Sequence, residues 1–202
     1  MLQVQELPRF STLNFHPLDE MSDRAFYEFC LKNRDLRIER TAKGEVIVMS
    51  PAGGFTGSKN FRLNVQFGNW VLKDGRGEGF DSSTGFILPN GATYAPDVAW
   101  VRYSRLAFLT DLEKQAFLPL CPDFLIELRS RTDSLPKLKR KMAEYIDNGL
   151  HLGWLIDPQN ETVWIYRPNA KPEKLISPTE VSGDPELLGF TLDLTRIWNP
   201  PF

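Results

Sequence analysis

Apolar residues follow two different spacings along this chain, and each spacing predicts a different kind of element. Between Ser134 and Asn148 they recur every three or four residues, which is typical of a helix with one buried face (Leu135, Leu138, Met142, Tyr145 and Ile146). Elsewhere, short apolar runs end at turn residues such as Asn90-Gly91 and Asp157-Pro158, which is typical of strands. The pattern predicts a chain in which helices and short strands are interleaved.

This pattern assigns an element to most of the chain. Helices are expected over residues 22–31, 57–72, 105–114 and 134–148, the first of them capped by Ser22. Strands are expected over residues 36–41, 45–49, 86–88, 94–101, 124–128, 152–156 and 162–166, the last antiparallel to the one before it. In the helix over 57–72, Phe61, Val65 and Trp70 lie near one face.

The order of these elements predicts an α/β fold with a mixed central sheet flanked by helices. A chain of 202 residues usually makes one domain. We expect that domain over residues 18–167, after an irregular N-terminal arm over residues 1–17. Residues 168–202 are rich in proline and are expected to pack on the same domain and to add short edge strands.

Composition excludes several classes of protein. Hydrophobic residues at 42% and charged residues at 25% are ordinary globular proportions, and the net charge of −2 gives no overall attraction to nucleic acid. The two cysteines form no CxxC pair, and two histidines exclude a histidine-rich metal site. The apolar runs are far too short to cross a membrane, and Met1–Leu13 has no signal-peptide pattern. We therefore expect a cytoplasmic protein.

Two acidic residues lie next to apolar strands, where a carboxylate is costly unless it is paired or binds a metal. Glu127 lies within the apolar strand over 124–128, and Asp97 directly precedes the apolar run that begins at Val98. Two carboxylates on neighbouring strands suit Mg²⁺, with Mn²⁺ as an alternative ion. The structural alternatives are an ion pair of Glu127 with Arg129 or a helix lysine, and a turn or capping role for Asp97.

Basic residues are concentrated just after the strand that carries Glu127. Residues 129–141 hold six cationic side chains and one acidic residue (Arg129, Arg131, Lys137, Lys139, Arg140 and Lys141, with Asp133). Such a cluster can bind a phosphate backbone, although a solvated helix face also explains it. Lys141 flanks the apolar face of its helix, so it either reaches a bound phosphate or covers core surface and pairs with a neighbour.

An ordered set of motifs resembles the Uma-type family of restriction endonuclease-like proteins, within the PD-(D/E)XK nuclease superfamily. The resemblance covers about residues 18–167, and its motifs are the segments 37–40, 50–54, 81–86, 96–98, 122–130 and 155–158, together with Lys141 and Tyr145. It implies a restriction-endonuclease-like core and a metal-dependent endonuclease that hydrolyses DNA.

The resemblance also implies roles for individual residues. Asp97 and Glu127 match the two acids of the motif and would bind Mg²⁺ together with the backbone carbonyl of Leu128. The superfamily lysine normally follows the second acid by two residues, where this chain has Arg129, which cannot lose its proton at working pH. Lys141 is therefore the candidate for the catalytic lysine, and Glu39 for a further acid.

Three hypotheses follow for the function. The first is an Mg²⁺-dependent endonuclease that acts on DNA as a homodimer, with Arg129 and Lys137 as substrate contacts. The second keeps the fold without catalysis, as a binding or assembly module. The third, a hydrolase that uses Ser82 or Ser83, is weaker because there is no GxSxG motif and only His16 or His151 is available as the base.

Overall fold

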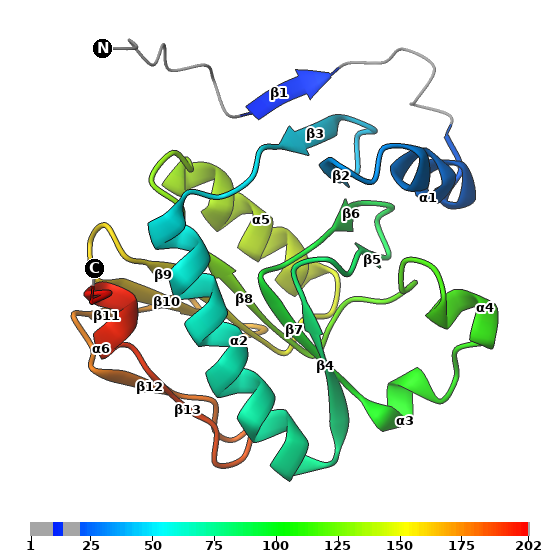
Figure 1. The fold of residues 1–202 in the computed structure, drawn as a ribbon. Helices are drawn as coiled ribbons and strands as arrows, with labels where there is room; N and C mark the ends of the chain where they lie inside the picture. Colours follow the sequence, from blue (N-terminus) through cyan, green and yellow to red (C-terminus); the bar gives the residue numbers. More distant parts are fainter. Residues whose placement is uncertain (1–9, 14–20, 202) are drawn as a thin grey trace, which may run out of the picture.

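A six-stranded mixed sheet forms the centre of the computed structural model, which describes residues 10–13 and 21–201 (Figure 1). Its strand order is β11 (Glu173–Ile176), β10 (Thr162–Tyr166), β9 (Leu152–Asp157), β8 (Phe124–Leu128), β7 (Val98–Arg102) and β4 (Gly77–Asp81). The β8 and β9 strands are parallel, and every other neighbouring pair is antiparallel. Every residue of β8 and β9 is buried, so the two central strands are covered on both faces.

Helices cover the two faces of this sheet. The helix α2 (Gly54–Asp74) packs Leu63, Phe67 and Val71 on one face, where α6 (Thr195–Trp198) and the pair β12 (Glu180–Ser182) and β13 (Thr191–Asp193) complete the core. The helix α5 (Leu135–Asp147) covers the other face with Met142 and Tyr145. It also connects the parallel strands β8 and β9, as parallel pairing requires.

A second sheet lies beside the first. Its strand order is β1 (Phe10–Leu13), β3 (Val46–Met49), β2 (Arg37–Arg40), β6 (Thr93–Tyr94) and β5 (Phe86–Ile87). The helix α1 (Asp23–Lys32) packs Phe26 against Ile38 and Val46 of this sheet. Because β6 leads directly into Asp97 and β7, the chain joins the two sheets at the point where the candidate acids lie.

The predicted mixed α/β architecture is confirmed. Ser22 caps α1 by accepting a hydrogen bond from the amide of Ala25, β2 and β3 form an antiparallel hairpin, and β10 runs antiparallel to β9. Residues 173–193 supply the extra strands expected near the C-terminal end. The irregular arm expected over residues 1–17 lies outside the described residues, except for Phe10–Leu13, which pair with β3.

Two details of the predicted helices are wrong. The helix expected over 105–114 is two short helices, α3 (Tyr103–Leu106) and α4 (Asp111–Lys114), because Thr110 and Glu113 form a capping box that starts a new helix. In α2, Phe61 and Val65 are exposed whereas Trp70 packs against the core beside Phe67, so the three residues expected near one face lie on two sides of the helix. This helix carries apolar residues on two sides, so spacing alone did not show which side faces the sheet.

None of the helices in the described part of the chain is both long and apolar enough to span a membrane.

The edge of the central sheet gives a first prediction. A Cβ added to Gly77 of β4 would lie 2.5 Å from Trp100 Cε2 and 2.5 Å from the carbonyl oxygen of Val101. Because both neighbours are buried in β7, we expect Gly77→Ala to lower the free energy of unfolding by about 2 kcal/mol. Urea denaturation followed by circular dichroism measures this change.

The matched control is Gly54→Ala, at the start of α2, where an added Cβ meets nothing within 4 Å. It should change the stability by less than about 1 kcal/mol. Equal stabilities for the two variants would contradict the close packing of β4 on β7.

Candidate active site

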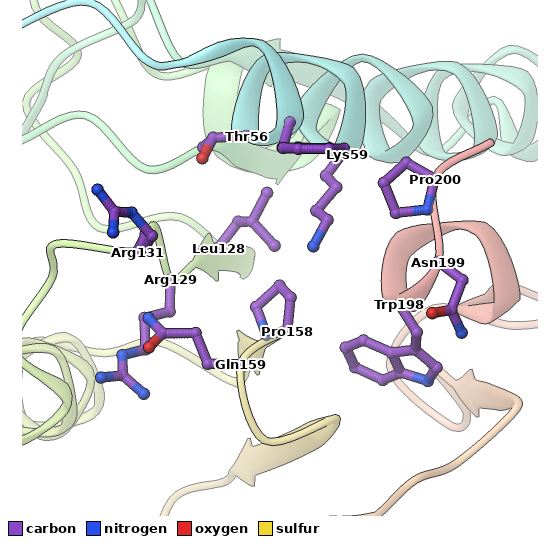
Figure 2. Close-up of a pocket in the computed structure, with 11 residues that line it drawn as sticks. Thr56, Lys59, Leu128, Arg129, Arg131, Pro158, Gln159, Trp198, Asn199 and Pro200 are labelled. Carbon is purple, nitrogen blue, oxygen red and sulfur yellow. The ribbon is translucent and has the colours of Figure 1, made fainter. Parts of the chain in front are cut away.

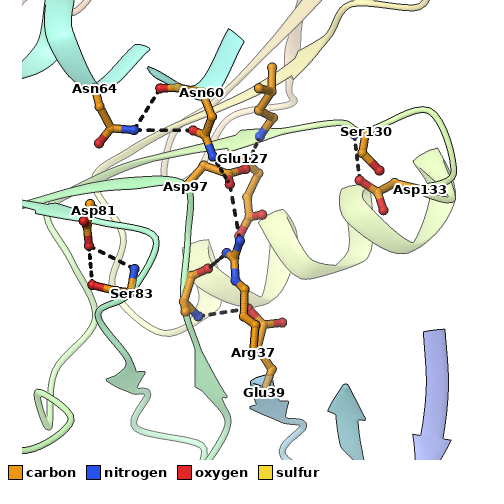
Figure 3. A network of polar contacts seen from close by, with 12 residues as sticks. Arg37, Glu39, Asn60, Asn64, Asp81, Ser83, Asp97, Glu127, Ser130 and Asp133 are labelled. Carbon is orange, nitrogen blue, oxygen red and sulfur yellow. Dashed lines mark hydrogen bonds and ion pairs between the residues drawn. The ribbon is translucent and has the colours of Figure 1, made fainter. Parts of the chain in front are cut away.

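Four of the predicted site residues come together where the two sheets meet. Lys141 Nζ lies 2.9 Å from Glu39 Oε1 and 2.8 Å from Glu127 Oε1, and Asp97 completes the group from the start of β7. Figure 3 shows Glu39, Asp97 and Glu127 gathered around the side chain of Arg37. We call Glu39, Asp97, Glu127 and Lys141 the acid cluster.

Each member is positioned by the element that carries it or by a backbone amide of a neighbouring segment. Glu39 on β2 accepts a hydrogen bond from the amide of Ala95 at 2.9 Å. Asp97 accepts one from the amide of Leu128 at 2.8 Å, which ties the start of β7 to the end of β8. Glu127 points to the α5 face because side chains alternate along a strand, and Ile126 packs on the α2 face. On α5, Lys141 directly precedes the buried Met142.

Three further side chains hold the cluster together, and none of them is among the site residues predicted from the sequence. An Arg37 guanidinium nitrogen lies 3.7 Å from Asp97 Oδ1, and the same oxygen accepts a hydrogen bond from the side-chain amide of Asn60 at 3.0 Å. The Tyr145 hydroxyl donates to Glu127 Oε1 at 3.2 Å. The sequence could have predicted that Arg37 lies near the site, because it precedes Glu39 by two residues and is therefore on the same side of β2.

Burial gives these groups unusual electrostatics. Glu39, Asp97 and Glu127 are 3%, 8% and 5% exposed. Burial, with the charges of Asp97 and Glu39, raises the pKa of Glu127 to about 7, although Lys141 opposes the rise. Burial also lowers the pKa of Lys141, but Glu127 and Glu39 outweigh it, so that this pKa is raised overall. Lys141 is therefore a cation at neutral pH.

The donor chemistry of the cluster fits a hard divalent cation. Its ligands are carboxylate oxygens without any thiol or imidazole, and Mg²⁺ needs one or two carboxylates besides water and substrate phosphate. Within residues 10–13 and 21–201 there is no group of three or more His, Cys, Asp and Glu side chains that could hold a metal by themselves. Asp97 and Glu127 thus fit Mg²⁺ only as part of a set that water and substrate complete.

The remaining predicted residues lie around the cluster. Arg129 pairs with Asp157 of β9 at 2.9 Å and donates to the carbonyl of Asp133, so its guanidinium is directed away from the acids. Lys137 lies exposed one turn before Lys141. Leu128 is buried beside Asp97, whose carboxylate its backbone amide holds. The ion pair expected for Glu127 is therefore made by the helix lysine and not by Arg129.

The residues of a serine hydrolase do not come together. The Ser83 hydroxyl donates a hydrogen bond to Asp81. His151 Nδ1 lies 3.4 Å from Asp123 Oδ1, and Asp123 directly precedes β8, at the end of the strand away from Glu127. His16 lies outside the described residues. Within the part of the chain that the structure describes, no serine makes a hydrogen bond with a histidine.

Two comparisons with known proteins find a match to this chain. The model of the Uma2 family, described as "Putative restriction endonuclease", matches residues 23–195. The chain is also similar to the crystal structure of "a putative nuclease belonging to DUF820 from Anabaena variabilis", with a TM-score of 0.68 and 20% sequence identity, over 80% of this chain and 89% of that one. This likeness shows a shared fold. Among curated proteins, none matches the chain.

The raised pKa of Glu127 predicts how stability depends on pH in chelator. The folded chain keeps the Glu127 proton to higher pH than the unfolded chain does, so the free energy of unfolding falls as pH rises from about 4.5 to about 7. Glu127→Gln removes this loss, which amounts to as much as about 3 kcal/mol. Lys141 keeps Glu39 as its partner in that variant. Melting temperatures at a series of pH values measure the difference.

Asp97→Asn is the matched comparison and should be destabilising. Both Asp97 oxygens accept hydrogen bonds. An asparagine has only one acceptor oxygen, so its NH2 group would face another donor, either the side-chain amide of Asn60 or the backbone amide of Leu128. Parallel pH profiles for the parent and Glu127→Gln would show that Glu127 ionises as an ordinary carboxyl does.

Proposed function

Because this chain belongs to the Uma2 family of restriction endonuclease-like proteins, we propose that it is an Mg²⁺-dependent endonuclease that hydrolyses phosphodiester bonds in DNA. The observation that carries the proposal is the acid cluster, in which a lysine with a 15% exposed side chain lies between two buried carboxylates beside a third. Burying so many charges is costly, and such costs are concentrated at functional sites.

Asp97 and Glu127 are the carboxylates that would hold the ion, together with the backbone carbonyl of Leu128. When bound there, a divalent ion stabilises negative charge on the phosphate and lowers the pKa of its water. The hydrogen bonds from Leu128 and Asn60 fix the Asp97 carboxylate before any substrate arrives, which reduces reorganisation during the reaction.

The role of Lys141 follows from its protonation. Because Glu127 and Glu39 raise its pKa, Lys141 remains an ammonium group and cannot serve as the base. We infer that it orients the attacking water by donating a hydrogen bond and offsets the negative charge that develops on the phosphate. Glu39 holds the lysine in place. Arg129, committed to Asp157, does not take this role, but it and Lys137 remain proposed DNA contacts.

A second candidate function has an observation in its favour. Lys141 and Arg37 already neutralise much of the acid cluster, as they would in a network that only stabilises the fold. In that case the chain is a binding or assembly module with the nuclease fold and no catalysis.

Cleavage of supercoiled DNA in Mg²⁺ or Mn²⁺ tests the enzyme. We expect nicking by the parent, and losses of at least about 100-fold in Asp97→Ala, which loses an ion ligand, and in Lys141→Ala, which loses charge stabilisation. Lys73→Ala, an exposed change in the last turn of α2, is the control and should retain activity. Circular dichroism establishes that each variant is folded.

Titration with Mg²⁺ by calorimetry separates the two candidates. A parent that neither cuts DNA nor binds the ion would favour the module. Loss of activity in Asp97→Ala alone, with Lys141→Ala active, would refute the role of the lysine.

We also propose that the protein acts as a homodimer through the exposed side of α2. Gly57, Phe61, Val65, Gly68 and Leu72 lie within an arc of about 80° on this helix. Phe61 and Leu72 are 70% and 86% exposed. A Cβ added to either glycine would meet nothing within 4 Å. When two copies of α2 pack antiparallel about a two-fold axis, Phe61 faces Gly68 and Leu72 faces Gly57, so the stripe complements itself.

Sedimentation equilibrium tests this assembly. We expect a dimer for the parent and a monomer for the double variant Phe61→Ser with Leu72→Ser, because each buried apolar side chain contributes about 1.5–3 kcal/mol. Phe108→Ser, which is 89% exposed elsewhere, is the control and should remain dimeric. A monomeric parent, or a dimeric double variant, would contradict the proposal.

A further inference from the structure

A pocket of about 380 Å³ lies beside the acid cluster, between the first turns of α2, the ends of β8 and β9, and α6 (Figure 2). Leu128 belongs to both sites, since its side chain lines the pocket and its amide holds Asp97. Lys59 and Asn60 are consecutive in α2, and Lys59 lines the pocket whereas Asn60 bonds to Asp97. The pocket and the acid cluster are therefore adjoining sites.

The charge of the pocket has one sign. Lys59, Arg129 and Arg131 line it, and none of its lining residues is acidic, although the whole chain has a net charge of −2. Arg129 shares its charge with Asp157. No carboxylate of the described residues is within ion-pair distance of Lys59, whose ammonium group points into the pocket in Figure 2. Among the residues that the structure describes, Lys59 thus supplies a charge that no carboxylate offsets.

The start of α2 adds a second positive contribution. This helix begins at Gly54 after the N-cap Gly53, which makes no side-chain cap, and its first turn contains no acidic residue. The dipole of the helix therefore favours negative charge at this end, and no acidic side chain of the first turn offsets it. Phe55 and Thr56, from the same turn, line the pocket.

The size and walls of the pocket match one unit of a nucleic acid strand. A volume of about 380 Å³ is at the lower end of the range for small-molecule sites. The indole of Trp198 forms the wall opposite the arginines, and its Nε1 is committed to the carbonyl of Pro178 at 2.8 Å. The ring can therefore offer an apolar surface, while Lys59 offers the cation.

We propose that this pocket binds a backbone phosphate of the DNA strand, next to the phosphate that is cleaved, with Lys59 as its main ligand and Trp198 against the attached sugar or base. The inference rests on the proposed function, which places the scissile phosphate at the acid cluster. It assigns to the pocket the task of positioning the strand, which the acid cluster does not perform.

Fluorescence anisotropy with a short fluorescein-labelled DNA duplex tests the inference in chelator, where no cleavage occurs. We expect Lys59→Ala to weaken binding about tenfold at low salt and to reduce the slope of log Kd against log salt by about one. Lys59→Arg should restore most of the affinity. Lys73→Ala, which removes a lysine about 21 Å further along the same helix, is the matched control and should bind as the parent does.

The outcomes separate this inference from the proposed function. If Lys59→Ala binds DNA as tightly and with the same salt slope as Lys73→Ala, or if the parent binds no DNA, the inference is overturned whatever the cleavage assay shows. If the parent cuts no DNA with any ion but loses affinity on Lys59→Ala, the pocket is supported and the catalytic proposal fails. Asp97→Ala should abolish cleavage while leaving the effect of Lys59→Ala on binding in place.

Discussion

The arrangement of the acid cluster follows from the cost of burying carboxylates. Glu39 and Glu127 lie on different strands, Asp97 directly precedes a third, and each is less than a tenth exposed, so cations and amide donors must surround them. Lys141 bridges Glu39 and Glu127, and Arg37 lies beside Asp97. These contacts join the second sheet, the central sheet and α5 at one place. The geometry of the fold and that of the candidate site therefore depend on the same few ion pairs.

The negative charges of this cluster are not all equally stabilised, and the carboxylate of Glu127 is stabilised least. Asp97 has two hydrogen-bond donors and a nearby guanidinium, and Glu39 has an amide and a lysine. Glu127 shares Lys141 and receives a weak bond from Tyr145, which leaves its pKa raised to about 7. A carboxylate that the fold stabilises poorly gains most from an added cation. This makes Glu127 the position at which a divalent ion would most stabilise the folded chain.

Much of this site, but not all of it, could be predicted from the sequence. Glu127 was detectable because a charge within a fully apolar strand needs a partner, and Lys141 because it flanks the apolar stripe of its helix. The buried side of α2 could not be predicted, because Phe61 and Val65 on one side of the helix are as apolar as Leu63 and Phe67 on the other. The charged pocket was not detectable either. It combines α2 with Trp198, and only the packing of the residues near the C-terminal end brings them together.

The lysine of the acid cluster does not lie two residues after the second acid, the position that the motif of the sequence resemblance implies. An arginine two residues after Glu127 would lie on the same strand and the same face as that acid if the strand continued. The β8 strand ends at Leu128, however, and Arg129 turns to Asp157 at the end of β9. The space beside Glu127 is then filled from α5, by a lysine that two acids keep protonated. Moving the cation from the strand to the helix leaves Arg129 on the wall of the neighbouring pocket, where its fixed charge faces the proposed path of the DNA strand.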